Sequence, residues 1–217
     1  MIGIDLAGKL IVFEGLDASG KSTQARRLAG RLERAGLDVV TTREPGGTPI
    51  AEGVRRVLLE KQHEALLPFS ELLLFMVSRA QNTHEVILPA LRAGRTVVAS
   101  RYRLSSLAYQ GYGRGLDLDL IRQLNEAATA GTVADHTVLI DVPAEYTMRR
   151  KADRGDRIEV ESIDFHRRVR SGFLELTEGD PTVHVVDGTR SIAEVGDEVA
   201  GSLGLQPFAS STSGGVS

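Results

Sequence analysis

A nine-residue segment between an apolar run and a helical pattern is the most constraining feature of this sequence. Residues 15–23 read Gly-Leu-Asp-Ala-Ser-Gly-Lys-Ser-Thr, which has the glycine, lysine and hydroxyl spacing of a phosphate-binding loop. Residues 10–13 predict a buried strand before it, and the apolar spacing of residues 23–35 predicts a helix after it. Such a turn directs backbone N–H groups and a helix dipole at one point. The sequence therefore predicts a nucleoside triphosphate site.

Individual residues of this loop have predicted roles. Lys21 would place its positive charge on the β- and γ-phosphates, and the Ser22 hydroxyl would bind Mg²⁺. An ordinary glycine turn before a helix is the alternative, but the chain has only four lysines, which favours the phosphate-binding interpretation. The expected ATP-binding residues of the loop are Gly15, Leu16, Asp17, Ala18, Ser19, Gly20, Lys21, Ser22 and Thr23.

Length and composition limit the class of protein. A chain of 217 residues that is 41% hydrophobic and 25% charged is typical of one soluble globular domain. A net charge of −3 argues against general nucleic-acid binding, and the absence of cysteine excludes disulfides and thiolate metal sites. Neither a signal-peptide pattern nor an apolar stretch of membrane-spanning length occurs. We expect a cytoplasmic protein without membrane or nucleic-acid partners.

Strand and helix patterns alternate along the chain, which predicts an α/β fold. The expected strands are residues 10–13, 38–43, 96–99, 137–141 and 183–186, and the expected helices are 23–35, 48–61, about 70–93, 117–130, 164–178 and 191–203. Such alternation is typical of a parallel sheet, here of about five strands, with helices on both faces. We expect one domain over residues 1–205 and a disordered, Ser/Gly-rich tail over residues 206–217.

Two further motifs directly follow predicted strands, at the sheet edge where ligands bind in open α/β folds. Residues 43–47 read Arg-Glu-Pro-Gly-Gly, and a cis proline there would hold Arg43 and Glu44 toward the cleft. An ordinary turn with exposed charges is the alternative for this motif. Residues 100–111 supply an arginine for a phosphate, with hydroxyl, phenol and amide groups suited to a base or sugar.

Phe75 and Arg79 lie four residues apart in the long helical stretch and therefore share one helix face. An aromatic ring beside a guanidinium can stack on a nucleobase while the guanidinium donates hydrogen bonds to its edge. The alternative is a core ring beside a solvated charge. The two residues extend the predicted nucleotide site onto this helix.

Together these motifs resemble those of thymidylate kinases. The matching segments, in chain order, are residues 15–23, 43–47, Phe-x-x-x-Arg-Ala-Gln at 75–81, Arg-Tyr-x-x-Ser-Ser-x-Ala-Tyr-Gln-Gly at 101–111, and Asp-Arg-Ile-Glu at 156–159. The resemblance extends over about residues 10–199. It implies a P-loop kinase fold, transfer of the ATP γ-phosphoryl group to dTMP to give dTDP, Mg²⁺ with ATP as co-substrate, and a homodimer.

The same resemblance implies roles for individual residues. Asp17 would bind the 3′-hydroxyl of dTMP, Arg101 its phosphate, and Tyr109 would occupy the space of a ribose 2′-hydroxyl. Phe75 would stack on thymine, Arg79 would reach its exocyclic oxygen, and Ser106 and Gln110 would contact the base. Arg149 would lie against adenine. The expected substrate-binding set is Asp17, Arg43, Glu44, Pro45, Phe75, Arg79, Arg101, Ser106, Tyr109 and Gln110.

A run of five cationic residues within positions 149–157 predicts a lid over the triphosphate, placed at about residues 149–161. A solvated basic face is the alternative. The phosphate loop has Ala18 and Ser19 where some thymidylate kinases carry an arginine, and enzymes without it supply one from the lid. The resemblance therefore implies Arg154 as a catalytic residue beside Lys21 and Arg101. Arg150 and Arg157 are the alternative lid cations.

Ser100 departs from the family pattern, in which an aspartate precedes Arg-Tyr and helps to organise Mg²⁺. A serine offers only a neutral oxygen, which is a weaker ligand for a hard cation. Asp17, Glu14 and Glu159 are the candidates to compensate. The departure leaves two alternative functions open: a kinase for another pyrimidine monophosphate, and a nucleotide-binding protein with weakened catalysis.

Overall fold

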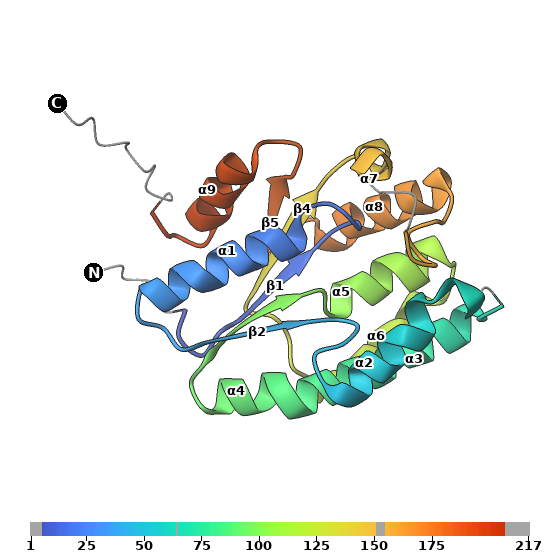
Figure 1. Cartoon of the computed structure of the whole chain (residues 1–217), viewed down its shortest axis with the longest axis horizontal. Coiled ribbons are helices and arrows are strands. Elements are labelled where there is room, and N and C mark those ends of the chain that lie inside the picture. The colour runs from blue at the N-terminus through green and yellow to red at the C-terminus, as the bar shows by residue number, and fades with distance from the viewer. Residues whose placement is uncertain (1–5, 64, 151–154, 207–217) are drawn as a thin grey trace.

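The computed structural model describes residues 6–63, 65–150 and 155–206. Within them, five strands form one parallel sheet in the order β2-β3-β1-β4-β5 (Figure 1). Each strand begins and ends within one residue of its predicted range. The strands are β1 (Leu10–Glu14), β2 (Val39–Arg43), β3 (Thr96–Ser100), β4 (His136–Asp141) and β5 (Val183–Asp187).

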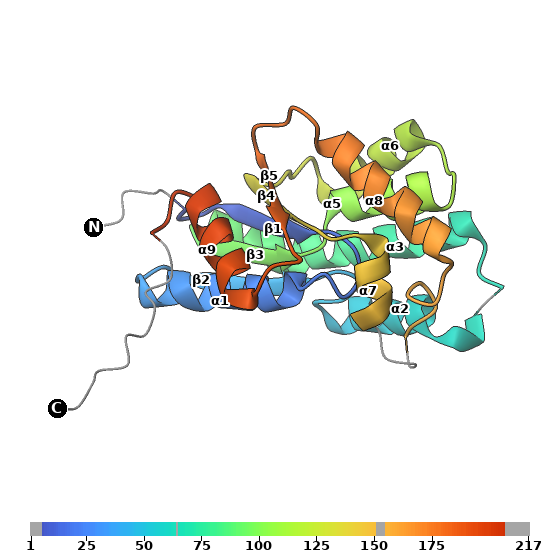
Figure 2. The same ribbon diagram turned by 90° about the horizontal axis from the view of Figure 1, so that it is seen from above.

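The sheet is covered by helices on both faces, as the sequence predicts (Figures 1 and 2). All five residues of β1 are buried. Ile11 and Phe13 pack on one face with apolar residues of α1 (Lys21–Arg34) and α9 (Ile192–Ser202), which lie side by side. Leu10 and Val12 pack on the other face, in a cluster that includes Ala90. Alternation of side chains across a strand produces this division between the two faces.

The predicted helices begin at residues whose side chains can accept backbone hydrogen bonds. The side chains of Thr48, Asp117, Ser162 and Ser191 each cap the N-terminus of the helix that follows. These helices are α2 (Pro49–Leu59), α6 (Leu118–Thr129), α8 (Ile163–Thr177) and α9. With α1, all lie within two residues of their predicted bounds, because capping and apolar spacing are local signals.

The long helix predicted over about residues 70–93 is divided in the structure. α3 (Pro68–Asn82) continues into a π-helical turn, η2 (Thr83–Ile87), and then into α4 (Leu88–Arg92). Pro89 has no N–H group, so the carbonyl of Glu85 loses its usual hydrogen-bond donor. The backbone hydrogen bonds of this turn then change from the spacing of an α-helix to the wider spacing of a π-helix. Other short elements carry no sequence periodicity and were not predicted: η1 (Lys61–His63), α5 (Arg103–Ser106), the π-helical η3 (Leu107–Gly113) and α7 (Ala144–Arg150).

The domain packs up to Leu205, which is 7% exposed within the cluster beneath α1 and α9. Nearly all of the predicted tail, residues 207–217, lies outside the described residues. None of the helices in the described ranges is long and apolar enough to cross a membrane.

Candidate active site

The phosphate loop lies at the carboxyl edge of the sheet, where β1 has β3 on one side and β4 on the other. Successive connections leave this point in opposite directions, which opens a crevice for a ligand. Gly15 has a φ of 133°, and a Cβ there would clash with the carbonyl oxygen of Ile140. Gly20, with a φ of 101°, leads directly into α1. Only glycine adopts these conformations readily, which explains the spacing of the motif.

Lys21, the first residue of α1, folds back into the loop. Its ammonium group donates to the carbonyl oxygen of Leu16 and, at 3.4 Å, to Ser19 Oγ. Burial and the positive charge of Arg101 lower the pKa of Lys21 to about 7, against the opposing effect of Asp17. The side chain therefore lies within the loop, and its lowered pKa allows it to gain a proton when negative charge enters the loop.

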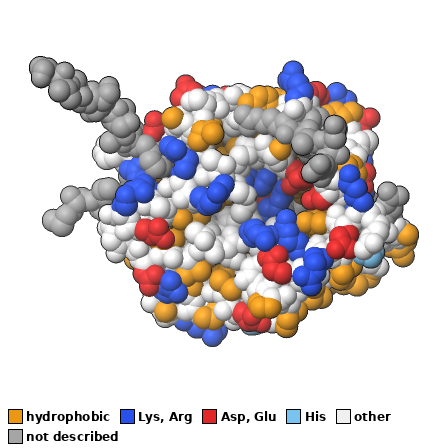
Figure 3. All heavy atoms as spheres, in the orientation of Figure 1, with side chains coloured by type: hydrophobic (Ala, Val, Ile, Leu, Met, Phe, Trp, Pro, Cys, Tyr) orange, Lys and Arg blue, Asp and Glu red, His pale blue; other side chains and the backbone are white. Residues whose placement is uncertain are grey.

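A pocket opens beside this loop, with an empty volume of about 570 Å³ that is partly open to solvent. Figure 3 shows Lys and Arg side chains gathered next to Asp and Glu side chains on this side of the molecule. The lining residues are Asp17, Glu44, Pro45, Arg55, Leu59, Phe75, Arg79, Arg101, Ser105, Ser106, Tyr109, Gln110, Asp156, Ile158 and Glu159. Nine of the ten expected substrate-binding residues are among them, and Arg43 is the exception.

Arg101 is the centre of a hydrogen-bonded network in this pocket. It has a left-handed φ of 71°, directly after β3. Its Nη2 donates to Asp17 Oδ1 at 2.5 Å and to the Tyr109 hydroxyl at 3.0 Å, and its Nη1 donates to Ser105 Oγ at 2.9 Å. Burial acts to raise the pKa of Asp17, but the charges of Arg101 and Lys21 hold it well below its usual range. Asp17 therefore stays ionised.

Glu14 supports this network from behind, at the end of β1. Its carboxylate accepts hydrogen bonds from Tyr102 N at 2.8 Å, from Ser105 N at 3.2 Å and from Ser105 Oγ at 2.5 Å. Burial raises its pKa above the ordinary glutamate value. Since the hydroxyl of Ser105 donates to Glu14, its oxygen is left to accept from Arg101. Glu14 thus fixes the segment that follows Arg101.

Arg79 is almost fully buried, between α3 and the segment after β3. It donates from Nε to Glu44 Oε2 at 2.8 Å, from Nη1 to Ser106 Oγ at 2.9 Å and to Asn125 Oδ1 at 2.5 Å, and from Nη2 to the Tyr102 carbonyl at 2.7 Å. Among the described residues, these bonds use four of the five N–H groups of a guanidinium, so one on Nη2 has no acceptor there. The Glu44–Pro45 peptide that leads into this pairing is cis.

Arg43 and Ser100 lie in a different hollow, beside the N-terminus of α1. The two residues are paired in register across β2 and β3, and they share this hollow with the Ser22 hydroxyl. Arg43 forms an ion pair with Glu52 at 3.0 Å. Of the described residues, none that lines the hollow carries a carboxylate. Ser22 and Ser100 therefore lie together in a hollow that has no carboxylate and is lined by the cationic Arg26 and Arg43, and this is where the sequence analysis places the metal.

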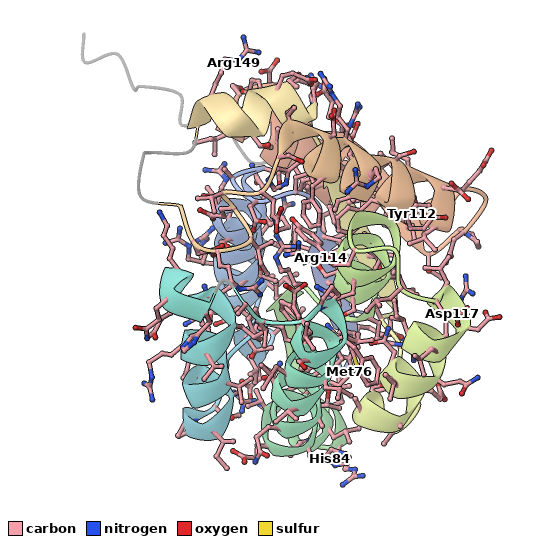
Figure 4. All side chains as sticks on the ribbon, turned by 90° about the vertical axis from the view of Figure 1, so that its right-hand side faces the viewer. Met76, His84, Tyr112, Arg114, Asp117 and Arg149 are labelled. Carbon is pink, nitrogen blue, oxygen red and sulfur yellow. The ribbon has the colours of Figure 1, made fainter. Side chains whose placement is uncertain are left out.

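The predicted lid is described only in part. Arg154, the expected catalytic arginine, lies outside the described residues, as does the side chain of Arg150. Arg149 is exposed at the end of α7 and points away from the body of the molecule (Figure 4). Residues 155–161 form the pocket wall through Asp156, Ile158 and Glu159.

Arg157, an alternative lid cation, is buried below this wall. Its Nε donates to the Leu58 carbonyl at 3.0 Å, and its Nη2 lies 2.7 Å from Glu71. It therefore ties the segment to α2 and α3 rather than reaching into the pocket.

Six pocket residues were not predicted to bind substrate. Ser105, Asp156, Ile158 and Glu159 lie inside the motifs that carry the family resemblance, but only Glu159 among them had a predicted role, as a candidate to compensate for Ser100 at the metal. Arg55 and Leu59 come from α2 and belong to no motif. Arg55 Nη1 donates to the Pro45 carbonyl at 2.8 Å, a contact that depends on how α2 packs beside the cis peptide.

Comparisons with known proteins agree with this geometry. The family model for thymidylate kinase matches residues 13–199. The thymidylate kinase of Kosmotoga olearia is 47% identical over 192 residues, which cover 87% of this chain and 92% of that protein. The thymidylate kinase of Deinococcus radiodurans is 47% identical over 195 residues, with 88% and 94% coverage. The crystal structure of thymidylate kinase from Ehrlichia chaffeensis matches with a TM-score of 0.75 at 36% identity, covering 91% of this chain and 98% of that chain.

Proposed function

The chain belongs to the thymidylate kinase family, and from this premise we propose that the pocket beside the phosphate loop is its dTMP site and that the loop holds ATP. The chain is an ATP-dependent phosphotransferase that phosphorylates dTMP. Nothing in the comparisons favours either alternative function. We place the activity in the cytoplasm, on the composition of the sequence.

The observation that carries the site assignment is the convergence of nine expected residues on one pocket. They come from separate segments of the chain, and Asp17 belongs to both the phosphate loop and the pocket. Phosphoryl transfer depends on holding donor and acceptor in line and on cations around the transferred group. A phosphate loop that adjoins an arginine-containing pocket meets both requirements.

The residues divide the work according to their chemistry. Arg101, with Arg55 nearby in the lining, would hold the acceptor phosphate, and the ionised Asp17 would accept the hydrogen bond of the 3′-hydroxyl. Phe75 would stack on the base. Tyr109, whose hydroxyl donates to Asp17 at 2.8 Å, would leave no room for a 2′-hydroxyl. Lys21 would place its charge on the β- and γ-phosphates.

The hollow at Ser22 fits a Mg²⁺ ion that arrives with the nucleotide. Mg²⁺ prefers oxygen ligands and keeps several waters, so the hydroxyl of Ser22 together with phosphate oxygens is a suitable set. The neighbouring Ser100 adds a second neutral oxygen but no charge. When bound, the ion would neutralise charge on the β- and γ-phosphates.

A coupled assay of ADP release, with ATP, Mg²⁺ and a panel of monophosphates, tests this function. The panel contains dTMP, dUMP, dCMP and the ribose form of dTMP. We expect the highest kcat/KM with dTMP and a large loss with the ribose form, because the Tyr109 ring occupies the place of the added hydroxyl. A higher kcat/KM for another monophosphate would replace dTMP as the acceptor. Equal values of kcat/KM for dTMP and its ribose form would show that Tyr109 does not select the sugar.

The finer proposal of a homodimer rests on α3. Phe69, Leu73 and Val77 are spaced by four residues and are 47%, 40% and 48% exposed, which forms an apolar stripe on the outer face of this helix. A second copy of the chain is the occupant that the family resemblance implies. Analytical ultracentrifugation should give a dimer for the wild type and a monomer for Leu73→Glu. Ile192→Glu, an equal change at an exposed site on α9, should remain dimeric.

A further inference from the structure

A buried glutamate on α3 lies behind the base-binding side of the pocket and is used by none of the roles above. Glu71 is 1% exposed, in the first turn of α3. Two arginines surround its carboxylate. Arg114 donates from Nε at 3.2 Å and from Nη2 at 3.1 Å, and Arg157 Nη2 lies 2.7 Å away. Figure 4 shows Arg114 above α3, the helix that carries the labelled Met76.

These contacts keep the carboxylate charged. Burial alone would raise the pKa of Glu71, but the hydrogen bonds and charge of Arg114, aided by Gln110 and Arg157, hold the pKa below its ordinary value. An ionised carboxylate can only accept hydrogen bonds. Any amide that faces Glu71 must therefore present its NH₂ group.

Gln110 is that amide. Its Nε2 donates to Glu71 Oε1 at 2.9 Å, and its side chain lines the dTMP pocket. Rotating the amide by 180° would set its oxygen against the carboxylate, so the charge on Glu71 excludes that orientation. The oxygen Oε1 accepts no hydrogen bond from the described residues and is the amide atom left for a ligand. The pocket thus offers one acceptor from Gln110 and one donor from Arg79.

We propose that Glu71 is a positioning residue for base selection: by fixing the amide of Gln110 with its oxygen toward the ligand, it favours pyrimidines that carry an N3–H donor and a 4-keto acceptor. Thymine and uracil present this pattern, whereas cytosine presents an acceptor at N3 and a donor at N4. Cytosine would therefore set like groups against both Gln110 and Arg79. The proposal rests on the proposed placement of the base beside Gln110.

The variant that tests this is Glu71→Gln, which keeps the shape of the side chain and removes its charge. A neutral amide can donate or accept, so Gln110 becomes free to rotate. We expect the ratio of the dissociation constants of dCMP and dTMP to fall by roughly tenfold, since one mispaired buried polar group costs about that much in binding. The affinity for dUMP, which retains N3–H, should change in step with that for dTMP.

The matched control is Glu161→Gln. Glu161 forms an ion pair with Arg114 on its other side and does not line the dTMP pocket. This variant perturbs the same arginine but leaves the pair of Glu71 and Gln110 intact, so the dCMP to dTMP ratio should not move. The positioning role would be overturned if the ratio of the dissociation constants of dCMP and dTMP changed equally in both variants, or changed in neither. A merely structural effect would weaken the binding of both nucleotides together and leave this ratio unchanged.

A second variant, Gln110→Met, keeps the proposal testable if Glu71→Gln fails to fold. Loss of the amide should also lower the ratio of the dissociation constants of dCMP and dTMP, because it weakens the binding of dTMP more than the binding of dCMP. Equal weakening of the two nucleotides would leave Gln110 as a contact and overturn the role of Glu71 in selection. No change in either dissociation constant would instead overturn the proposed placement of the base itself.

Discussion

Asp17 and Arg101 form an ion pair of 2.5 Å that joins the phosphate loop to the end of β3. The two side chains are 21% and 13% exposed, so the pair is well shielded from solvent. Asp17 precedes Lys21, the lysine proposed to bind ATP, by four residues, and Arg101 is the arginine expected on the acceptor phosphate. The pair therefore directly connects the proposed ATP-binding loop with the proposed dTMP pocket.

Replacing Asp17 by asparagine should lower kcat/KM for dTMP by roughly ten- to hundredfold, because a hydrogen bond to a charged group is worth about 1.5–3 kcal/mol. Steady-state kinetics measures the effect. Asp38→Asn is the control, since the Asp38 pair with Arg95 has side chains 68% and 40% exposed and should matter little. Comparable losses in the two variants would show that the position of the pair is irrelevant.

Binding of ATP should take up a proton at Lys21. Its pKa is lowered to about 7 within the loop, and a triphosphate beside the ammonium would return the pKa toward its ordinary value. The complex then holds more protons than the free protein, so the affinity for ATP should fall as pH rises above 7, by up to about tenfold per unit. Calorimetry at pH 8 in two buffers of different ionisation enthalpy measures the uptake.

The control for that experiment is Lys21→Met, which removes the titrating group. We expect this variant to stay folded, to show no linked proton uptake and to lose phosphoryl transfer by orders of magnitude. Identical heats in both buffers for the wild type would exclude the proposed titration. A folded Lys21→Met protein with near wild-type turnover would exclude Lys21 from the chemistry.

Introducing a carboxylate at Ser100 should lower the Mg²⁺ concentration required for half-maximal activity. No described residue that lines the hollow is acidic, so Ser100→Asp adds an attraction without a repulsive neighbour. Coulomb attraction in water is about 1 kcal/mol for two unit charges 4 Å apart and therefore about 2 kcal/mol for a carboxylate and a dication, which corresponds to roughly a thirtyfold shift. Mg²⁺ titrations at fixed ATP and dTMP measure this shift in the Mg²⁺ requirement. Gln123→Glu, at an exposed position on α6, is the charge-matched control. A higher requirement in Ser100→Asp would indicate that another carboxylate already serves there.

Arg154 lies outside the described residues, and its role remains a prediction from the sequence. Arg154→Ala should lower kcat by about 10³-fold or more, with little change in KM for dTMP, because an interaction made in the transition state acts on kcat. Arg149→Ala provides the contrast, since a residue against adenine should raise KM for ATP. If Arg154→Ala changed only KM, Arg154 would be excluded as the catalytic arginine, and another lid cation would have to carry that role.

Most of the local structure could be predicted from the sequence. The five strands fall within one residue of their expected bounds, because buried parallel strands are short apolar runs closed by turn residues. The phosphate loop is equally local, since the positive φ angles of Gly15 and Gly20 require glycine at those two positions. Three of the motifs, at residues 15–23, 43–47 and 100–111, adjoin the ends of β1, β2 and β3, and parallel strands end at one edge, so most of the site residues could be predicted.

What only the tertiary structure decided is how side chains from distant segments share their hydrogen bonds. The π-helical widening before Pro89 and in η3 depends on backbone partners that no apolar periodicity reveals. Arg43 belongs to the same motif as Glu44 but lines another hollow, because Arg43 is the last residue of β2 whereas Glu44 lies in the turn that follows. Glu71 and Gln110 are 39 residues apart. The sequence by itself determined which chemical groups reach the pocket, whereas packing determined their orientation, because a buried polar atom must find its partner wherever the fold places one.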